Sequence, residues 1–354
     1  MPTLLITGGA GFIGANFVAY WRRFRPADLI VVLDSLTYAG NFESIAPQCN
    51  NDLCRFVHGD ICDGATVEVL FKKYDFDVVV NFAAESHVDR SIYASQVFTR
   101  TNVQGTHTLL DAALAAWKPS FRGRRFHHIS TDEVFGSLAP DDPPFTEQSR
   151  YDPRSPYAAS KAASDFLVRA YAHTHGLPVT ITNCSNNYGP YQLPEKLIPL
   201  MIVNALTGHK LPIYGDGGNV RDWLYVEDHC AAIALVLDKG RVGETYNVGG
   251  RNERTNLHVV HTVCDLLDRM EPSPRGPRRQ LIGFVTDRPG HDRRYAIDAS
   301  KLERELGWRA LETFETGLEK TVAWYLAHRA WWQDILARGY RAERVGVIGS
   351  QTGR

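Results

Sequence analysis

The sequence predicts an α/β fold in which a doubly wound parallel sheet carries a smaller α/β lobe. Three observations favour this fold. Short apolar runs alternate with helical patterns through the first half of the chain, and a glycine-rich turn joins the first apolar run to the first helical pattern. Beyond Gly189-Pro190 the predicted elements become shorter, and Gly and Pro punctuate them. Continuous apolar strands are typical of a parallel sheet that helices cover on both faces.

Strands and helices alternate in the first half of the chain, as a doubly wound sheet requires. The predicted strands are residues 4–7, 29–33, 55–58, 78–82 and 126–130. The predicted helices are residues 12–24, 65–74 and 96–117. The strands are apolar along their length, so we expect both faces of the sheet to be buried.

A longer helix is predicted over residues 156–175. Ser155 is a favourable N-cap residue, and Pro156 suits the first helical position. Strands are then expected at residues 179–183 and 244–248, and both could belong to the main sheet.

This pattern predicts two domains and a tail. Residues 1–190 are expected to form the sheet domain, which also receives segments near 220–250. Residues 191–340 are expected to form mainly the smaller lobe, over the carboxyl edge of the sheet. The last residues, 341–354, are predicted to be a frayed tail.

The composition argues against several classes of protein. The formal net charge is −1 and 44% of the residues are hydrophobic, which favours a globular protein without a general affinity for nucleic acid or membranes. The chain has no signal-peptide pattern and no run of 18 apolar residues, so we expect a cytoplasmic protein. None of the six cysteines lies in a zinc-type cluster, so we expect reduced thiols and no metal site.

The glycine-rich turn has the pattern of a dinucleotide-binding loop. Gly9, Gly11 and Gly14 follow the spacing Gly-x-Gly-x-x-Gly, and Gly8 precedes them. Glycine permits a tight turn and the close approach of a pyrophosphate, whose charge the next helix N-terminus stabilises. Asp34 lies 20 residues past Gly14, where a carboxylate binds both ribose hydroxyls of NAD and repels the 2′-phosphate of NADP. We therefore expect NAD, although an ordinary strand-helix turn could also contain these glycines.

Tyr157 and Lys161 are four residues apart, so they share one face of the predicted helix. A nearby lysine cation lowers the pKa of a phenol from its ordinary value of about 10. A tyrosinate can then take a hydroxyl proton while hydride leaves the same carbon. The alternative interpretation is an ordinary helix with a packed tyrosine and an exposed lysine.

Together these features resemble the extended short-chain dehydrogenase/reductase superfamily. The resemblance rests on the glycine loop, Asp34, the run Asn81-Phe82-Ala83-Ala84, Asn102 and the Tyr157/Lys161 pair, and it covers nearly the whole chain. It implies a Rossmann domain, a smaller substrate lobe and commonly a nucleotide sugar as substrate. The expected cofactor positions are Gly8, Gly11, Phe12, Ile13, Gly14, Asp34, Ser35, Leu36, Thr37, Asp60, Ile61, Phe82, Ala83, Ala84, Ser86, Thr101, Tyr157, Lys161 and Asn187.

Two carboxylic side chains, Asp132 and Glu133, follow Thr131 where epimerases of this superfamily have small hydroxyl residues. A neighbouring acid and base suit the elimination of water between C5 and C6 of a hexose. Oxidation at C4 makes the C5 proton acidic, a base removes it, an acid protonates the departing 6-hydroxyl, and hydride returns to C6. A solvated turn at the end of a strand would have the same two residues.

Residues 83–89, 131–136 and 185–190 closely resemble the dTDP-glucose 4,6-dehydratase family. This resemblance implies that Asp132 is the acid at the 6-hydroxyl and Glu133 the base at C5. It further implies that Tyr157 is the base at the 4-hydroxyl, that Lys161 tunes Tyr157 and holds the nicotinamide ribose, and that Thr131 hydrogen-bonds the 4-oxygen.

A nucleoside diphosphate needs cations, and the guanidinium groups of Arg221 and Arg288 can bind phosphate with two hydrogen bonds. The resemblance implies substrate positions at Ser86, His87, Thr131, Asn186, Lys196, Leu197, Pro212, Ile213, Tyr214, Arg221, Asn256, Asp287, Arg288 and His291. The expected substrate is dTDP-glucose. The nucleobase stays open between dTDP and UDP, because discrimination by one methyl group is worth only about 1–3 kcal/mol.

Two other functions remain possible from the sequence. One is an epimerase or decarboxylase that acts on a UDP sugar, and the other is a non-catalytic NAD-binding regulator. The family resemblance also implies a homodimer through the helices at residues 96–117 and 156–175. The apolar surface expected for it consists of Ala162, Ala163, Phe166, Leu167, Ala170 and Tyr171, and packing within one monomer is the alternative.

Overall fold

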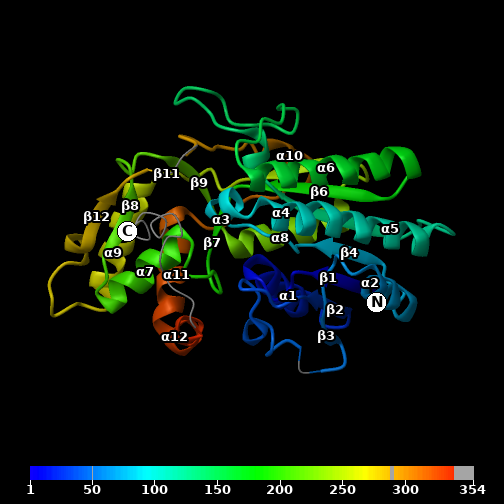
Figure 1. Ribbon diagram of the computed structural model, residues 1–354, viewed down its shortest axis with the longest axis horizontal. Coiled ribbons are helices and arrows are strands. Elements are labelled where there is room, and N and C mark those ends of the chain that lie inside the picture. The colour runs from blue at the N-terminus through cyan, green and yellow to red at the C-terminus, as the bar shows by residue number, and fades with distance from the viewer. Residues whose placement is uncertain (50, 288–290, 339–354) are drawn as a thin grey trace.

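The computed structural model describes residues 1–49, 51–287 and 291–338, which form a large and a small lobe (Figure 1). A seven-stranded sheet with the order β10-β6-β5-β4-β1-β2-β3 runs through the large lobe, and all its pairings are parallel. Its strands are β1 (Thr3–Thr7), β2 (Leu29–Asp34), β3 (Cys54–His58), β4 (Val78–Asn81), β5 (Arg125–Thr131), β6 (Val179–Cys184) and β10 (Thr245–Val248). The predicted doubly wound fold is confirmed, and β6 and β10 do belong to the main sheet.

Helices cover both faces of this sheet. They are α1 (Phe12–Phe24), α2 (Gly64–Lys73), α3 (Val88–Tyr93), α4 (Ser95–Phe98), α5 (Thr106–Trp117), α6 (Pro156–His175), α8 (Val226–Lys239) and α10 (Ser300–Leu306). Leu4 and Ile6 of β1 pack in the cluster that contains α1 and α8, whereas Leu5 packs in the cluster that contains α2 and α5. Because successive side chains of a strand point to opposite faces, a sheet covered twice requires apolar residues at every position.

The small lobe contains two short sheets and four helices, and it lies to the left in Figure 1. Its strands are β7 (Asn186–Tyr188), β8 (Leu211–Tyr214), β9 (Val220–Tyr225), β11 (Glu253–Thr255) and β12 (Ile282–Val285). Its helices are α7 (Leu197–Thr207), α9 (Asn256–Met270), α11 (Phe314–Ala327) and α12 (Arg329–Ala337). Short 3-10 turns occur in both lobes, namely η1 (Phe42–Ser44) and η3 (Asp132–Phe135) in the large lobe and η4 (Arg278–Leu281) in the small lobe. The lobe has its own apolar core, to which α7, α9 and α11 contribute.

The predicted helical stretch over residues 96–117 is confirmed, but it is not a regular α-helix along its whole length. A π-helix, η2 (Thr99–Gly105), separates α4 from α5. Within it the buried Asn102 accepts a hydrogen bond from the Glu85 amide and donates one to Ser160 Oγ, each at 2.8 Å. A π turn widens a helix locally and is frequent at functional sites. Here the turn holds the segment after β4 against α6.

Cys49 and Cys54 lie beside each other in the structure, and the expectation of reduced thiols stays a prediction. An isolated backbone β-bridge pairs Asn51 with Cys54. The Cα atoms of Cys49 and Cys54 lie 4.6 Å apart. The free cysteines are Cys62, Cys184, Cys230 and Cys264.

None of the described helices has the length and apolar character needed to cross a membrane. Within the described ranges, no group of three or more His, Cys, Asp or Glu side chains could hold a metal ion. The predicted tail at residues 341–354 lies outside the described residues.

Four histidines of the described chain are buried: His87, His127, His128 and His229. Burial disfavours the charged imidazolium. It lowers the pKa of His87 and of His128 to about 4, and that of His229 to about 3. Burial also lowers the pKa of His127 well below its ordinary value. All four rings are therefore neutral at pH 7.

We expect acid to destabilise the protein below about pH 6.5, the ordinary histidine pKa. Between that pH and about 4 the unfolded chain binds more protons than the folded one, so stability rises with pH in this window. Each unit of pKa depression is worth about 1.4 kcal/mol. Replacing His229 by Gln should flatten the fall of Tm with acid, as measured by calorimetry. The control is the same change at the exposed His173, and an equal slope in both variants would contradict the prediction.

Candidate active site

A cleft lies at the carboxyl ends of β1, β2, β4, β5 and β6, where ligands bind in sheets of this kind. It brings together most of the predicted cofactor residues, the predicted catalytic residues and some of the predicted substrate residues. The predicted residues that line it are Gly8, Gly11, Phe12, Ile13, Gly14, Asp34, Ser35, Thr37, Asp60, Ile61, Phe82, Ala83, Ala84, Ser86, Thr101, Thr131, Asp132, Glu133, Tyr157, Lys161, Asn186, Asn187 and Lys196.

The remaining predicted residues do not line this cleft. They are Leu36, His87, Leu197, Pro212, Ile213, Tyr214, Arg221, Asn256, Asp287 and His291. Ile213 is only 1% exposed and packs in the core of the small lobe, because side chains of β8 alternate between its two faces. A substrate contact at Ile213 would therefore have to come from its backbone, and the predicted contact stays a prediction. Arg288 lies outside the described residues.

Several of these outlying residues form a second polar group on the small lobe. His291 accepts or donates a hydrogen bond with Asp287 at 2.6 Å, and its ring packs edge-on against Tyr214. Arg221 is buried, donates to the Asp292 carbonyl at 2.9 Å and stacks over the Tyr295 ring. This group comes from β8, β9 and the segment after β12.

Sequence reasoning missed several residues that line the cleft. They include Glu85, Arg100, Cys184, Gln192 and Glu195. Glu85 stands between two predicted residues and Glu195 precedes the predicted Lys196, so position along the chain was an available signal for both. Arg100 had the same signal, since it precedes the predicted Thr101, and the fold brings its guanidinium to Asp60, 2.7 Å away.

The glycine loop can exist only without side chains at two of its positions. Gly8 has a φ of +67°, and a Cβ there would lie 2.6 Å from the Ala83 backbone nitrogen. A Cβ on Gly14 would collide with the Gly8 carbonyl oxygen. Gly11 is the N-cap of α1 and no side chain caps that end. The N-terminus of α1 therefore points its positive dipole end into the cleft.

Asp34 connects the glycine loop to the end of β2. Its Oδ2 accepts a hydrogen bond from the Ala10 amide and its Oδ1 accepts one from the Leu36 amide, both at 2.9 Å. Burial raises the pKa of Asp34, although these two amide bonds oppose the shift. A carboxylate has about four acceptor positions, so each oxygen keeps a lone pair for a further donor.

Tyr157 and Lys161 lie on the first two turns of α6, which begins after Ser155 caps the Ala158 amide at 3.1 Å. The expected lowering of the Tyr157 pKa by Lys161 is opposed by other groups in this structure. Burial and then the negative charge of Glu133 raise the pKa of the phenol well above its ordinary value. The Lys161 ammonium donates instead to the Ile129 carbonyl at 2.7 Å, and burial lowers its pKa to about 8.

Asp132 and Glu133 form the 3-10 turn η3 after β5, and Thr131 caps it by accepting from the Glu133 amide at 3.2 Å. Asp132 is only 2% exposed, which excludes a solvated turn. Burial, and then the negative charges of Glu133 and Asp222, raise the pKa of Asp132 well above its ordinary value. Asp132 Oδ2 has no hydrogen-bond partner among the described residues. The site thus contains a carboxyl group whose surroundings favour its protonated form.

Comparison with known proteins agrees with this geometry. A family model described as GDP-mannose 4,6 dehydratase matches residues 5–321. The dTDP-glucose 4,6-dehydratases of Neisseria meningitidis serogroup B and of Xanthomonas campestris pv. campestris are 55% and 58% identical, each over 98% of this chain and 99% of the relative. The crystal structure of the Streptomyces venezuelae dTDP-glucose 4,6-dehydratase, with NAD bound, is 51% identical with a TM-score of 0.86, and the match covers 94% of this chain and 99% of that one. The chain belongs to the dTDP-glucose 4,6-dehydratase family.

Proposed function

We propose that this protein converts dTDP-glucose to dTDP-4-keto-6-deoxyglucose, with tightly held NAD that is regenerated in each turnover. The observation that carries this proposal is the acid-base pair Asp132 and Glu133 in the same cleft as Tyr157 and the glycine loop. An epimerase needs no such pair, and a binding module needs neither the pair nor a Tyr157/Lys161 arrangement. The family of the chain supports the same function.

The cleft fits NAD in its shape and its chemistry. The close packing at Gly8 and Gly14 leaves bare backbone beside the N-terminus of α1, which suits a pyrophosphate. The remaining lone pairs of Asp34 suit the two hydroxyls of a ribose. When bound, NAD supplies the acceptor and donor of hydride for the reaction.

Tyr157 is the base that takes the proton of the 4-hydroxyl. Burial makes a phenolate costly at this place, so proton removal depends on a nearby cation. Lys161 is one helical turn further along the same face of α6 and provides that cation. Thr131, at the end of β5, donates a hydrogen bond to the 4-oxygen.

Asp132 is the acid that protonates the departing 6-hydroxyl, and Glu133 is the base that removes the C5 proton. The raised pKa of Asp132 favours the protonated form that a general acid needs. Glu133 follows directly in η3 and is less buried than Asp132. Two adjacent carboxyl groups in different environments can thus act as acid and base in one step.

The nucleotide sugar is held between the two lobes. Ser86, Asn186 and Lys196 line the cleft on the sugar side. Arg221 and the Asp287/His291 pair of the small lobe bind the nucleoside diphosphate. Arg288 remains a predicted contact. This arrangement accords with a cofactor domain of residues 1–190 that also receives segments near 220–250, and with a substrate lobe of mainly residues 191–340.

We also propose that the protein is a cytoplasmic homodimer whose interface is formed by α4, η2, α5 and α6. Val97 and Phe166 are large apolar side chains exposed on these helices. A groove beside them is lined by residues of α4, η2 and α5 and by Leu167. Ala162 does not belong to this surface, because it packs against Val134 and Phe135 inside the chain.

Replacing Phe166 by Glu should convert the dimer to a monomer, because a carboxylate would be buried in the interface. Phe166 is 55% exposed, and Phe24 on α1 is 54% exposed and serves as the matched control site. Light scattering after size-exclusion chromatography gives the mass of each variant. A dimeric Phe166→Glu, or a monomeric wild type, would refute the proposed interface.

Replacing Asp132 by Asn or Glu133 by Gln should lower kcat by about two to four orders of magnitude, the usual contribution of general acid-base catalysis. Both variants should still oxidise the sugar, which is seen as a rise in nicotinamide absorbance when enzyme and dTDP-glucose are mixed. Mass spectrometry of the product measures the loss of water. The control is Glu68→Gln, an exposed position on α2. Normal water loss in either variant would disprove its assigned role.

Product analysis across dTDP-, UDP-, GDP- and CDP-glucose, without added cofactor, tests the whole proposal. We expect a 4-keto-6-deoxy sugar with dTDP-glucose at the highest kcat/KM. Formation of a C4 epimer or of a decarboxylated sugar would favour the sibling enzymes. Stoichiometric NAD binding without turnover on any of the four would favour a regulator.

A further inference from the structure

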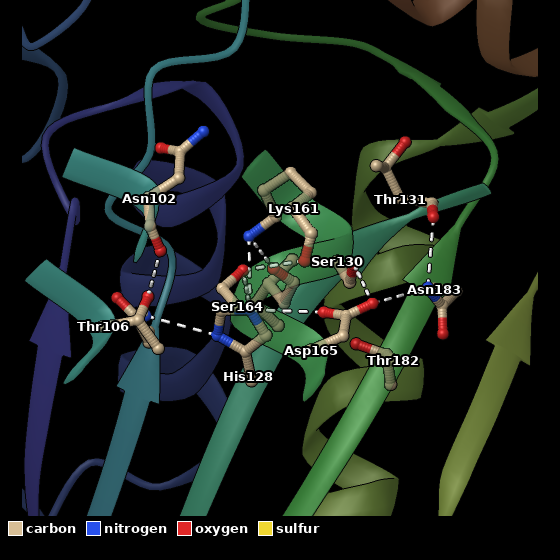
Figure 2. Close-up of polar contacts among 12 residues, drawn as sticks. Asn102, Thr106, His128, Ser130, Thr131, Lys161, Ser164, Asp165, Thr182 and Asn183 are labelled. Atoms are coloured by element: carbon tan, nitrogen blue, oxygen red, sulfur yellow. Dashed lines mark hydrogen bonds and ion pairs between the residues drawn. The ribbon is translucent and has the colours of Figure 1, made fainter. Parts of the chain in front are cut away.

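A buried polar cluster lies beneath the proposed active site, between β5 and α6. It consists of Lys161 and Asp165 from α6 and of His128 from β5, as Figure 2 shows. The His128 Nε2 atom is 3.3 Å from Lys161 Nζ and 3.4 Å from Asp165 Oδ1. All three side chains are buried. Lys161 and Asp165 are four residues apart, so the helix presents both to the same strand.

The hydrogen bonds around His128 determine its protonation. Thr106 Oγ1 donates to the Asn102 carbonyl, so it can only accept from Asn81 Nδ2, at 3.1 Å. The Asn81 amide nitrogen then also faces His128 Nδ1, at 3.2 Å, and must be the donor there. His128 Nδ1 is therefore an acceptor, and the proton of the neutral ring sits on Nε2, where it faces Asp165 and Ser164.

Asp165 is held as an anion by the donors around it. Its Oδ2 accepts hydrogen bonds from Ser130 Oγ at 2.8 Å and from the Tyr151 hydroxyl at 2.9 Å. Burial alone would raise the pKa of Asp165, but the hydrogen bond from His128 and the charge of Lys161 outweigh it and keep the pKa below its ordinary value.

Among the described residues, the Lys161 ammonium donates to the neutral Ile129 carbonyl. Its other near neighbour, His128 Nε2 at 3.3 Å, carries the proton of the neutral ring and therefore does not accept from it. The described titratable groups that act on its charge are Asp165 of α6 and Cys184 of β6, with His128 of β5 between. Burial raises the pKa of the Cys184 thiol, so that group is neutral. A buried ammonium needs a compensating negative charge, and among these groups only Asp165 supplies one.

We propose that Asp165 is a positioning residue for Lys161, acting through His128 as the buried counter-charge that keeps the lysine ammonium protonated and in place. This inference rests on the proposed role of Lys161 beside Tyr157. It assigns a function to a carboxylate that does not line the cleft and does not touch the reacting atoms. Ser130, Tyr151 and Asn183 orient that carboxylate from the opposite side.

The proposal predicts a specific change in how the protonation of Lys161, and with it kcat, depends on pH. Burial lowers the pKa of Lys161 to about 8, and Asp165 opposes this effect. The ammonium is lost as pH rises through its pKa, so loss of the Asp165 charge must bring that loss to a lower pH. A nearby opposite charge shifts a pKa by about one to three units, and we expect a shift of about one unit here.

The test compares Asp165→Asn with two matched variants. Asp165→Glu keeps the charge, and Tyr151→Phe removes one hydrogen bond to the same carboxylate without changing any charge. We expect the alkaline limb of kcat to move down by about one pH unit in Asp165→Asn, so that kcat falls about fivefold at pH 8 and little at pH 6.5. The alkaline limb of kcat should keep its wild-type position in Tyr151→Phe and in Asp165→Glu. The KM for the sugar should be nearly unchanged in all three variants.

A second readout needs no turnover. The affinity for NAD, measured by calorimetry from pH 6 to 9 without sugar, should weaken toward alkaline pH earlier in Asp165→Asn than in the wild type. If Asp165→Asn does not fold, His128→Gln interrupts the same connection and should shift the same limb.

The proposal is overturned if kcat of Asp165→Asn falls equally at all pH values, since a purely structural role predicts that result. It is equally overturned if the alkaline limb and the NAD affinity keep their wild-type pH dependence. Failure of the wild type to turn over any nucleotide hexose would instead refute the proposed function, and the NAD-binding measurement would still decide the role of Asp165.

Discussion

The parallel pairing of β5 with β4 and β6 determines where reactive groups can stand in this protein. Parallel strands end at a common edge, so the residues after each strand meet there although they are distant in the chain. Thr131 ends β5, and Asp132 begins the turn that follows it. The helix α6 then returns across the same strands and brings Tyr157 and Lys161 to that edge. Acid, base and phenol are therefore neighbours because of the sheet.

The pKa values of two buried aspartates at this edge are shifted in opposite directions, and the difference arises from their hydrogen-bond donors. Asp165 receives hydrogen bonds from Ser130, Tyr151 and His128, and its pKa is lowered. Asp132 has one oxygen without a described partner and stands near other carboxylates, and its pKa is raised. Burial of a carboxyl group thus has no fixed consequence, because the donors around it decide whether it stays charged. In the proposed mechanism one aspartate compensates a cation and the other donates a proton.

The same polar interior explains why β5 contains two histidines where an apolar strand was expected. His127 contacts Thr180 and His128 contacts Asn81, and burial keeps both rings neutral. Neutral rings can bond to side chains of the neighbouring strands without the cost of a buried charge. These hydrogen bonds therefore form a polar layer inside the sheet of the large lobe. The same buried histidines lower the stability of the fold in mild acid, and His128 also contacts the buried groups beneath the active site.

Much of the fold and of the site followed from local sequence patterns. The bounds of α1 and α6 agree with those predicted, since both helices start at clear signals: a glycine turn before Phe12, and Ser155 with Pro156. The glycine loop, Asp34 and the Tyr157/Lys161 pair depend on short spacings, so their meeting in one cleft could also be predicted.

Contacts between distant segments could not be predicted in this way. The π turn at Asn102 exists because its side chain bonds Glu85 and Ser160, and no local propensity reports such bonds. The side chain of Ile213 turns into the core of the small lobe because of the packing of β8. The sequence by itself determined the chemistry available to this protein, namely which side chains stand at each strand end and helix start. Only the tertiary structure decided their protonation and their partners, because burial and hydrogen-bond donors come from residues far away in the chain.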